Sequence, residues 1–346
     1  MVDMHTILRE TVVSTRIRLA RNLAGFPFPS KMKDTHASEI LHLVSEAFRE
    51  MQDDKYQCYP IHCLSENEKL SYKEGHLVSP LLLKQEENRA VIMSRDRSVA
   101  IMVNEEDHLR EQCISKGFTL REAYAKLSEI DNRLSDTLDF AYDQTLGYLT
   151  ACPSNLGTGM RASVMMFLPG LTYNGALEKL IPNLRGMGMT LRGAFGEGSQ
   201  AEGYLYQLSN EQTLGLSEEE ILERVSRVTE EVGIQEVGAR AEMLATSEMD
   251  LRDRCLRAYG TLTNCALLDM EEFRSKIIDV RLGIFLKFFK VKDLDAFDRF
   301  MDDMQPATFC MGHNLEGEPE RFYDEVRAEA VGSTLRSLMQ VVRNRY

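Results

Sequence analysis

The sequence predicts an α+β fold, in which an antiparallel sheet flanked by helices precedes an all-helical C-terminal region. Two nearly continuous apolar runs, at 89–94 and 98–103, are separated by a polar turn and predict a β-hairpin in a covered sheet. From Ser217 onward, apolar residues recur at helical spacing instead. The charge changes at the same place, because residues 211–346 contain 18 basic and 27 acidic side chains and carry -9 of the net -13.

Helices are expected on both sides of the predicted hairpin. In 36–51, Ile40, Val44 and Phe48 fall on one face, and a similar apolar stripe runs through 120–140. The front part of the chain therefore mixes strands and helices.

The helical region begins with a predicted capping box, in which the Ser217 hydroxyl accepts from the Glu220 amide and the Glu220 carboxylate accepts from the Ser217 amide. Further amphipathic segments follow at 240–258, 270–290 and 322–342. We place a domain boundary after a helix break at Val232-Gly233. This gives a domain of mixed strands and helices at 11–238 and a helical domain at 239–346.

Composition excludes several classes of function. With 346 residues the chain can build two domains, and its net charge of -13 disfavours nucleic-acid or anionic-membrane binding by bulk electrostatics. There is no signal-like or membrane-spanning apolar run, which indicates a cytoplasmic protein. Seven scattered cysteines without a CxxC pair predict reduced thiols and no metal site.

Arginines in a strand-like segment suggest phosphate binding. In Ser14-Thr15-Arg16-Ile17-Arg18, strand alternation places Arg16 and Arg18 on one face. Paired guanidinium groups match phosphate oxygens in bidentate geometry, although many Arg-x-Arg strand faces are merely solvated.

Three further segments contain reactive residue types. Residues 104–110 (NEEDHLR) follow an apolar strand, and one of their carboxylates could accept a proton instead of forming a solvated turn. Residues 152–164 (CPSNLGTGMRASV) combine Cys152 with a small-residue loop, in which we expect the backbone to approach a ligand closely and neighbouring arginines to lower the cysteine pKa. Residues 192–199 (RGAFGEGS) could form a closing loop that carries Glu197, or a flexible hairpin.

Together and in this order, STRIRLARN, NEEDHLR, CPSNLGTGMRASV and RGAFGEGS resemble the signatures of phosphagen (guanidino) kinases. The resemblance covers about residues 11–238 and implies the catalytic-domain fold of that family, which is like that of glutamine synthetase. It also implies transfer of the γ-phosphoryl group of Mg-ATP to a guanidinium nitrogen. Mg²⁺ can keep waters and phosphate oxygens as ligands, so no dedicated protein cage is expected.

Other features point to the bacterial protein-arginine kinase branch. Small-guanidine kinases carry a helical leader domain before the STRxR element, which begins here at Ser14. Residues 257–264 and 278–284 resemble segments of the protein-arginine kinases. Met165 stands where the small-guanidine enzymes have His after RASV.

The resemblance implies specific roles. Glu106 is expected to be the base that takes a guanidinium proton, with Glu105 in the same catalytic group. Glu197 and Cys152 are expected to contact the guanidinium, the cysteine as a thiolate. The nucleotide-binding residues implied are Ser14, Thr15, Arg16, Ile17, Arg18, His76, Arg110, Arg161, Ala162, Ser163, Val164, Met165, Arg192, Gly193, Ala194, Phe195 and Gly196.

Protein-arginine kinases also have a phosphoarginine pocket marked RDxxRA. The matching stretch here contains Tyr323, Asp324, Arg327 and Ala328, with Tyr323 in place of the first arginine. Asp324 and Arg327 are candidate ligands, and a helix-surface ion pair is the alternative.

The leading hypothesis is thus phosphorylation of arginine side chains in proteins. The resemblance further implies a homodimer, a zinc-binding activator protein, a stress-response repressor as a substrate and association with Clp proteases that degrade marked proteins. A small-molecule arginine kinase and a non-catalytic ATP-binding adaptor are the alternatives.

Overall fold

The computed structural model describes residues 3–51, 54–84, 87–193 and 202–342. The chain divides into two compact units, each with contributions from three segments. The first unit comprises Met1–Met166, Lys179–Arg192 and Gln207–Val232. The second comprises Phe167–Glu178, Gly193–Tyr206 and Gly233–Tyr346.

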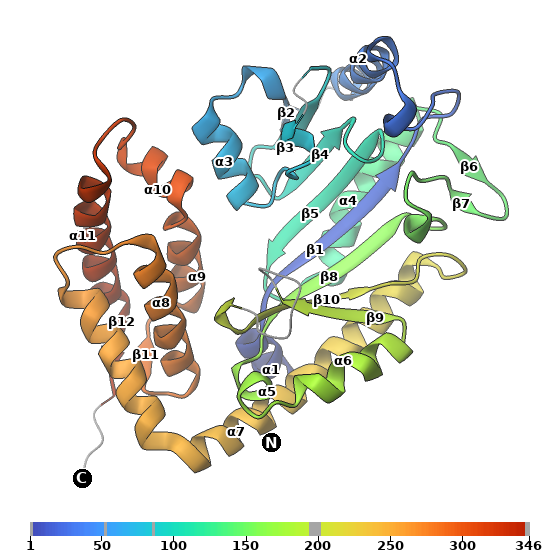
Figure 1. The fold of residues 1–346 in the computed structure, drawn as a ribbon. Coiled ribbons are helices and arrows are strands. Elements are labelled where there is room, and N and C mark those ends of the chain that lie inside the picture. The colour runs from blue at the N-terminus through green and yellow to red at the C-terminus, as the bar shows by residue number, and fades with distance from the viewer. Residues whose placement is uncertain (1–2, 52–53, 85–86, 194–201, 343–346) are drawn as a thin grey trace. The chain divides into compact units, whose positions relative to one another are not determined.

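An eight-stranded sheet is the main feature of the first unit, with strand order β2-β3-β4-β5-β1-β8-β10-β9 (Figure 1). Adjacent strands from β2 to β8 pair antiparallel, which confirms the predicted α+β class. The strands are β1 (Val12–Arg21), β2 (Tyr56–Pro60), β3 (Ala90–Ser94), β4 (Val99–Val103), β5 (Leu109–Lys116), β8 (Met160–Phe167), β9 (Met189–Gly193) and β10 (Leu205–Asn210).

Several α-helices and a small hairpin also precede the C-terminal region. The hairpin consists of β6 (Tyr142–Asp143) and β7 (Gly147–Tyr148). The helices are α1 (Met4–Thr11), α2 (Asp34–Glu50), α3 (Glu66–Glu74), α4 (Leu120–Ser135), α5 (Pro169–Tyr173) and α6 (Leu177–Gly186). The predicted hairpin is therefore confirmed as β3–β4, and the predicted helices at 36–51 and 120–140 as α2 and α4.

Alternation along β1 separates a core face from a polar face. Ile17 and Leu19 are at most 1% exposed and lie on the face covered by α4, which packs on β1 and β5 (Figure 1). Arg16 and Arg18 project from the other face, as their spacing predicts. One face of the sheet is thus covered by a helix, and the other face carries arginine side chains.

The C-terminal elements are α7 (Glu218–Asn264), α8 (Met270–Phe285), β11 (Phe289–Val291), α9 (Leu294–Asp303), α10 (Pro306–His313), α11 (Glu320–Leu338) and β12 (Met339–Val341). The predicted capping box is present, because Ser217 N–H donates to Glu220 Oε2 at 2.8 Å and Glu220 N–H donates to Ser217 Oγ at 3.3 Å. Short strands β11 and β12 pair antiparallel within the region that was expected to be all helical.

The break predicted at Val232-Gly233 does not occur. One helix, α7, continues through Gly233, and non-helical backbone appears only at Ser247 (φ -143°, ψ 30°). Glycine is unfavourable inside a helix, so Gly233 suggested a break, but it lies within α7. Glu236 and Arg240 follow it in the same helix, both buried and 3.1 Å apart at Oε1 and Nε.

None of the described helices is long and apolar enough to cross a membrane.

Candidate active site

Three neighbouring strands place arginines on one face of the sheet. Arg18 on β1 is directly opposite Arg161 on β8, and Ala20 on β1 is opposite Arg110 on β5. Directly paired residues of antiparallel strands point to the same face. The guanidinium groups of Arg18, Arg110 and Arg161 therefore lie on the polar face of the sheet, which also bears Arg16.

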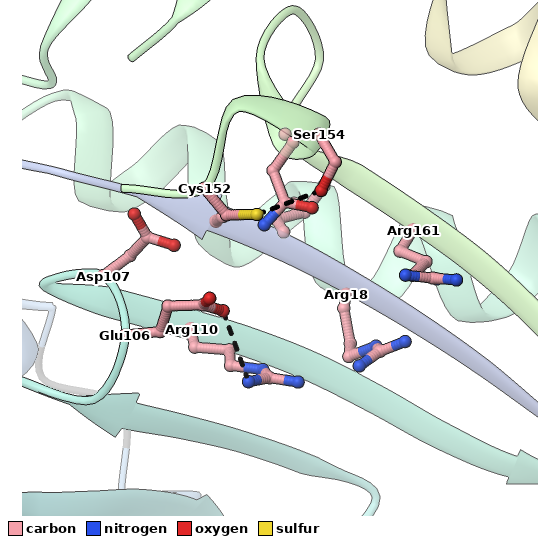
Figure 2. A pocket seen from close by; sticks show the side chains of 11 residues that line it. Arg18, Glu106, Asp107, Arg110, Cys152, Ser154 and Arg161 are labelled. Carbon is pink, nitrogen blue, oxygen red and sulfur yellow. Dashed lines mark hydrogen bonds and ion pairs between the residues drawn. The ribbon is translucent and has the colours of Figure 1, made fainter. Parts of the chain in front are cut away.

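A pocket of about 180 Å³ opens on this face (Figure 2). Arg18, Arg110 and Arg161 line it together with Glu106 and Cys152, and Arg110 lies next to Glu106. The lining residues are Arg18, Leu19, Ala20, Glu106, Asp107, Arg110, Cys152, Ser154, Asn155, Gly159 and Arg161. Three segments that are distant in sequence, 18–20, 106–110 and 152–161, thus meet at one cavity.

Burial makes this arginine cluster electrostatically strained. Burial and then the nearby Arg110 charge lower the pKa of Arg16 to about 10. Burial also lowers the pKa of Arg18 well below its usual range, and the charges of Arg16, Arg110 and Arg161 add to the effect. Arg18 Nε is buried without a hydrogen-bond partner among the residues that the structure describes. An anion such as a phosphate would relieve the repulsion and use the unpaired donor.

Glu105 binds Arg110 through both of its carboxylate oxygens. Its carboxylate is 3% exposed and accepts from Arg110 Nη1 at 3.0 and 2.9 Å and from Ser79 Oγ at 2.5 Å. Burial opposes ionisation of Glu105, but the Arg110 charge and these hydrogen bonds outweigh it and lower its pKa. Glu105 therefore orients Arg110 and does not line the pocket.

Glu106 has the properties of a proton acceptor that faces the pocket. Its Oε2 lies 3.9 Å from Arg110 Nη1, which is an ion pair without a tight hydrogen bond. Burial raises the pKa of Glu106, and the neighbouring charges of Asp107 and Glu105 raise it further. A raised carboxylate pKa brings its basicity closer to that required for general-base catalysis near neutral pH.

Residues 147–159, which we call the Cys152 loop, close the pocket opposite the arginines. Two of its glycines allow close backbone contacts within the protein. A Cβ on Gly157 (φ +101°) would lie 2.5 Å from the Thr213 carbonyl oxygen, and one on Gly159 would lie 2.7 Å from that of Ala20. Cys152 Sγ lies 3.1 Å from Ser154 Oγ at the pocket wall.

Several predicted nucleotide-binding residues have side chains on the covered face. Thr15, Ile17, Ala162 and Val164 are fully buried, and Thr15 Oγ1 donates to the Gly117 carbonyl at 2.7 Å. Ser163 is paired with Arg16 and therefore lies on the arginine face, and its Oγ donates to the Arg16 carbonyl at 3.1 Å. These residues hold the strands that carry the arginines.

The remaining predicted residues do not line the described pocket. Ser14 and Met165 are paired across β1 and β8, and Arg192 and Gly193 end β9. His76 has φ +57°, and its carbonyl accepts from Gln112 Nε2 at 2.8 Å. Ala194, Phe195, Gly196 and Glu197 lie outside the described residues.

Gln112 is a site residue that the sequence analysis missed. Its Oε1 accepts from Arg16 Nε at 3.0 Å, while its Nε2 donates to the carbonyls of His76 and Leu77. Gln112 therefore connects the His76 segment to the arginine face. The available signal was its position two residues after Arg110, which places it on the same face of β5.

The predicted phosphoarginine residues belong to the second unit. Arg327 is 5% exposed, and its Nη1 donates to the Leu268 carbonyl at 2.7 Å and to Asp324 Oδ1 at 2.8 Å. Tyr323 Oη lies 3.4 Å from Cys310 Sγ. Arg327 Nε is buried without a partner within the described ranges. Ala328 is buried on the same helix, α11.

No group of three or more His, Cys, Asp or Glu side chains in the described part of the chain is arranged to hold a metal ion.

Two family models together match most of the chain. One, described as ATP:guanido phosphotransferase, C-terminal catalytic domain, matches residues 39–239. The other, described as Protein-arginine kinase McsB C-terminal domain, matches residues 248–345.

Bacterial relatives match over nearly their whole length. The protein-arginine kinase of Caldanaerobacter subterraneus subsp. tengcongensis is 38% identical over 331 residues, which cover 94% of this chain and 97% of that protein. The protein-arginine kinase of Clostridium tetani is 39% identical, with 88% and 90% covered. That of Moorella thermoacetica is 41% identical, with 90% of each covered.

Solved structures share the fold. The duplicated taurocyamine kinase from Schistosoma mansoni, with bound transition-state-analogue components, superposes with a TM-score of 0.62 at 29% identity, covering 68% of this chain and 34% of that chain. A lombricine kinase superposes with a TM-score of 0.61 at 24% identity, covering 70% and 69%.

Proposed function

Because this chain belongs to the protein-arginine kinases of the ATP:guanido phosphotransferase family, we propose that it transfers the γ-phosphoryl group of ATP to arginine side chains of proteins. The observation that carries the proposal is the pocket in which Glu106 and Cys152 face three guanidinium groups. Cations that bind phosphate and a carboxylate that takes a proton are the two requirements of this reaction.

Phosphate binding is assigned to the arginine face. Arg16, Arg18, Arg110 and Arg161 bind the oxygens of ATP and stabilise the charge that develops on the transferred group. Arg18 Nε has no hydrogen-bond partner in the described structure, and a phosphate oxygen would accept a hydrogen bond from it. Mg²⁺ enters with ATP as part of the substrate and keeps waters and phosphate oxygens as ligands.

Glu106 is the proposed base. A guanidinium lone pair is delocalised, so the attacking nitrogen must be oriented and lose a proton. The nitrogen forms a bond to Pγ, the bond between Pγ and the β,γ-bridging oxygen breaks, the proton passes to Glu106, and ADP leaves. Cys152 contacts the edge of the acceptor guanidinium and forms no covalent intermediate.

The other predicted residues have supporting roles in this proposal. The strand residues Ser14, Thr15, Ile17, Ala162, Ser163, Val164 and Met165 position the phosphate-binding arginines. His76, Arg192, Gly193, Ala194, Phe195 and Gly196 complete the nucleotide site, and Glu197 contacts a second guanidinium nitrogen. Glu105 acts through Arg110, because their hydrogen bonds fix the guanidinium beside Glu106.

A domain division and a cellular role complete the proposal. We take 11–238 as the catalytic domain and 239–346 as a helical domain for dimerisation and phosphoarginine recognition through Tyr323, Asp324, Arg327 and Ala328. The protein acts in the cytoplasm in stress response, with a zinc-binding activator and a repressor substrate. The phosphoarginine that it forms on substrate proteins marks them for Clp-type degradation.

A small-molecule guanidino kinase is the second candidate, because the fold also matches the taurocyamine kinase structure. The test is incubation of the full chain with Mg-ATP and a folded arginine-containing protein, followed by localisation of phosphate by mass spectrometry at alkaline pH. Acid-labile phosphate on arginine supports the proposal. ATP binding with no phosphate transfer to the protein or to small guanidines would indicate an adaptor.

A further inference from the structure

Two buried polar side chains beside the pocket have no part in the proposed phosphoryl transfer. Asp107 is 2% exposed and Asn22 is 1% exposed. Asp107 Oδ1 accepts from Asn22 Nδ2 at 2.6 Å and from the Ala151 amide at 2.7 Å. Asp107 follows Glu106 in the chain, and Ala151 precedes Cys152, so one carboxylate oxygen connects the segments that carry both residues.

Asn22 adds a third segment to this connection. It directly follows β1, and its Nδ2 donates to the Leu149 carbonyl at 3.0 Å as well as to Asp107. Its Oδ1 accepts from the His108 amide at 2.9 Å. Both amide hydrogens and the amide oxygen are therefore used, and β1, the turn at 104–108 and the Cys152 loop are tied together.

We propose that Asp107 is a positioning residue that, with Asn22, fixes the Cys152 side chain relative to Glu106. This inference rests on the proposed function. In phosphoryl transfer to a guanidinium, the base and the group at the guanidinium edge must be correctly spaced, because a displacement of about 1 Å can cost roughly 10²-fold in rate. Asp107 provides the shortest described hydrogen-bonded route between these segments, with one side chain and one amide.

The chemistry of the bonds separates this role from direct substrate binding. Asp107 also lines the pocket, so contact between its charge and the acceptor guanidinium is the competing role. Both observed donors are neutral N–H groups that share one oxygen, Oδ1. Burial raises the pKa of Asp107, so its surroundings do not favour the ionised carboxylate. An asparagine at this position keeps an oxygen that can accept both bonds, whereas a substrate ion pair requires the carboxylate.

The test compares Asp107→Ala, Asp107→Asn and Asn22→Ala in the full chain. We expect Asp107→Ala to lower kcat by about 10²-fold and raise KM for the protein acceptor, with KM for ATP unchanged. Asn22→Ala should change the same parameters, and Asp107→Asn should restore most of the lost rate. The control is Asp136→Ala, at an exposed aspartate after α4, which should change none of them.

A second readout does not depend on activity. Hydrogen exchange in a peptide that covers 147–159 should become faster in Asp107→Ala and Asn22→Ala but not in Asp107→Asn. Equal losses of rate in Asp107→Asn and Asp107→Ala, with exchange unchanged in both, would overturn the inference in favour of direct substrate binding. Unchanged rate and exchange in Asp107→Ala would also overturn it. If the unsubstituted protein phosphorylates no arginine, the proposed function fails, while the exchange comparison still tests the connection.

Discussion

Arg18 on β1 and Arg161 on β8 are directly paired across the two strands, so two guanidinium groups share one face of the sheet. Burial lowers the pKa of Arg161, and the charge of Arg192 lowers it further. Burial and three neighbouring arginines have the same effect on Arg18. The free protein therefore keeps like charges together at a cost in stability, which bound phosphate would offset.

Arg18→Met should separate stability from activity. We expect the free energy of unfolding without nucleotide to rise by about 1 kcal/mol, because a half-buried charge that three neighbouring arginines repel is removed, while kcat/KM falls by about 10²-fold or more. Urea unfolding and ATP-dependent kinetics measure the two effects. Arg9→Met, at an exposed residue of α1, is the control. Lower stability combined with unchanged kinetics would contradict this view of Arg18.

Glu106→Gln should remove the acidic limb of the pH–rate profile. The base must be ionised, and burial raises the Glu106 pKa above its ordinary 4.5, so the wild-type rate falls as pH decreases through that raised pKa. The substitution should lower kcat by about 10² to 10⁴ without changing KM for ATP. Glu105→Gln should instead raise KM for ATP, since it releases Arg110. An unchanged acidic limb in Glu106→Gln would exclude Glu106 as the base.

His108 should make stability depend on pH. Its Nδ1 accepts from the Leu23 amide at 2.9 Å and its Nε2 lies 3.0 Å from the Pro27 carbonyl, an arrangement that fits the neutral ring. Burial lowers the His108 pKa below 6.5, so its contribution is present above pH 6.5 and is lost as pH falls through the folded-state pKa.

Urea unfolding between pH 7.5 and 5 measures this effect. His108→Asn should reduce the dependence by up to about 1.4 kcal/mol per pH unit over the window between the two pKa values. His42→Asn, on the exposed side of α2, should leave the dependence unchanged. The same slope in His108→Asn and wild type would contradict the assignment.

Gly157→Ala should destabilise the first unit. Gly157 has φ +101°, and an added Cβ would meet the Thr213 carbonyl oxygen at 2.5 Å. We expect a loss of about 2 kcal/mol or more in the free energy of unfolding. Gly186→Ala, at the end of α6 with open space around the added carbon, should stay within about 0.5 kcal/mol of wild type. Equal changes in the free energy of unfolding for the two substitutions would show that the contact between the added Cβ and the Thr213 carbonyl does not destabilise the protein.

Tyr323→Arg should strengthen phosphoarginine binding. The tyrosine contributes no cation, and Arg327 Nη1 is already used by Leu268 and Asp324. An added guanidinium should tighten binding of free phosphoarginine about tenfold in calorimetry, because charge-assisted hydrogen bonds to phosphate are strong. Tyr323→Gln is the neutral control. Equal affinities in wild type, Tyr323→Arg and Tyr323→Gln would show that this position does not face the ligand.

The sequence predicted features that depend on residues close to one another in the chain. Arg16 and Arg18 fall on one strand face because side chains alternate along a strand, and Ser217 caps its helix because a hydroxyl three residues before a glutamate suits that geometry. The hairpin of β3 and β4 was predicted from two nearly continuous apolar runs separated by a polar turn. Each of these features depends on residues that are close in sequence.

Features that depend on strand register or tertiary contacts were not predictable. The pairing of Arg18 with Arg161 requires the β1–β8 register, and the bonds of Asp107 to Asn22 and Ala151 join segments that no local pattern relates. The close approach of Gly157 to the Thr213 carbonyl was not predictable either, because sequence does not show which backbone lies against a glycine.

The most direct test of the central claim is a parallel measurement of kcat/KM for a folded arginine-containing protein and for free arginine, at the same Mg-ATP concentration. We expect phosphorylation of the protein, with acid-labile phosphate on its arginines, at a kcat/KM that exceeds that for free arginine, and loss of both activities in Glu106→Gln. Phosphorylation of free arginine alone would contradict the proposal that proteins are the substrate.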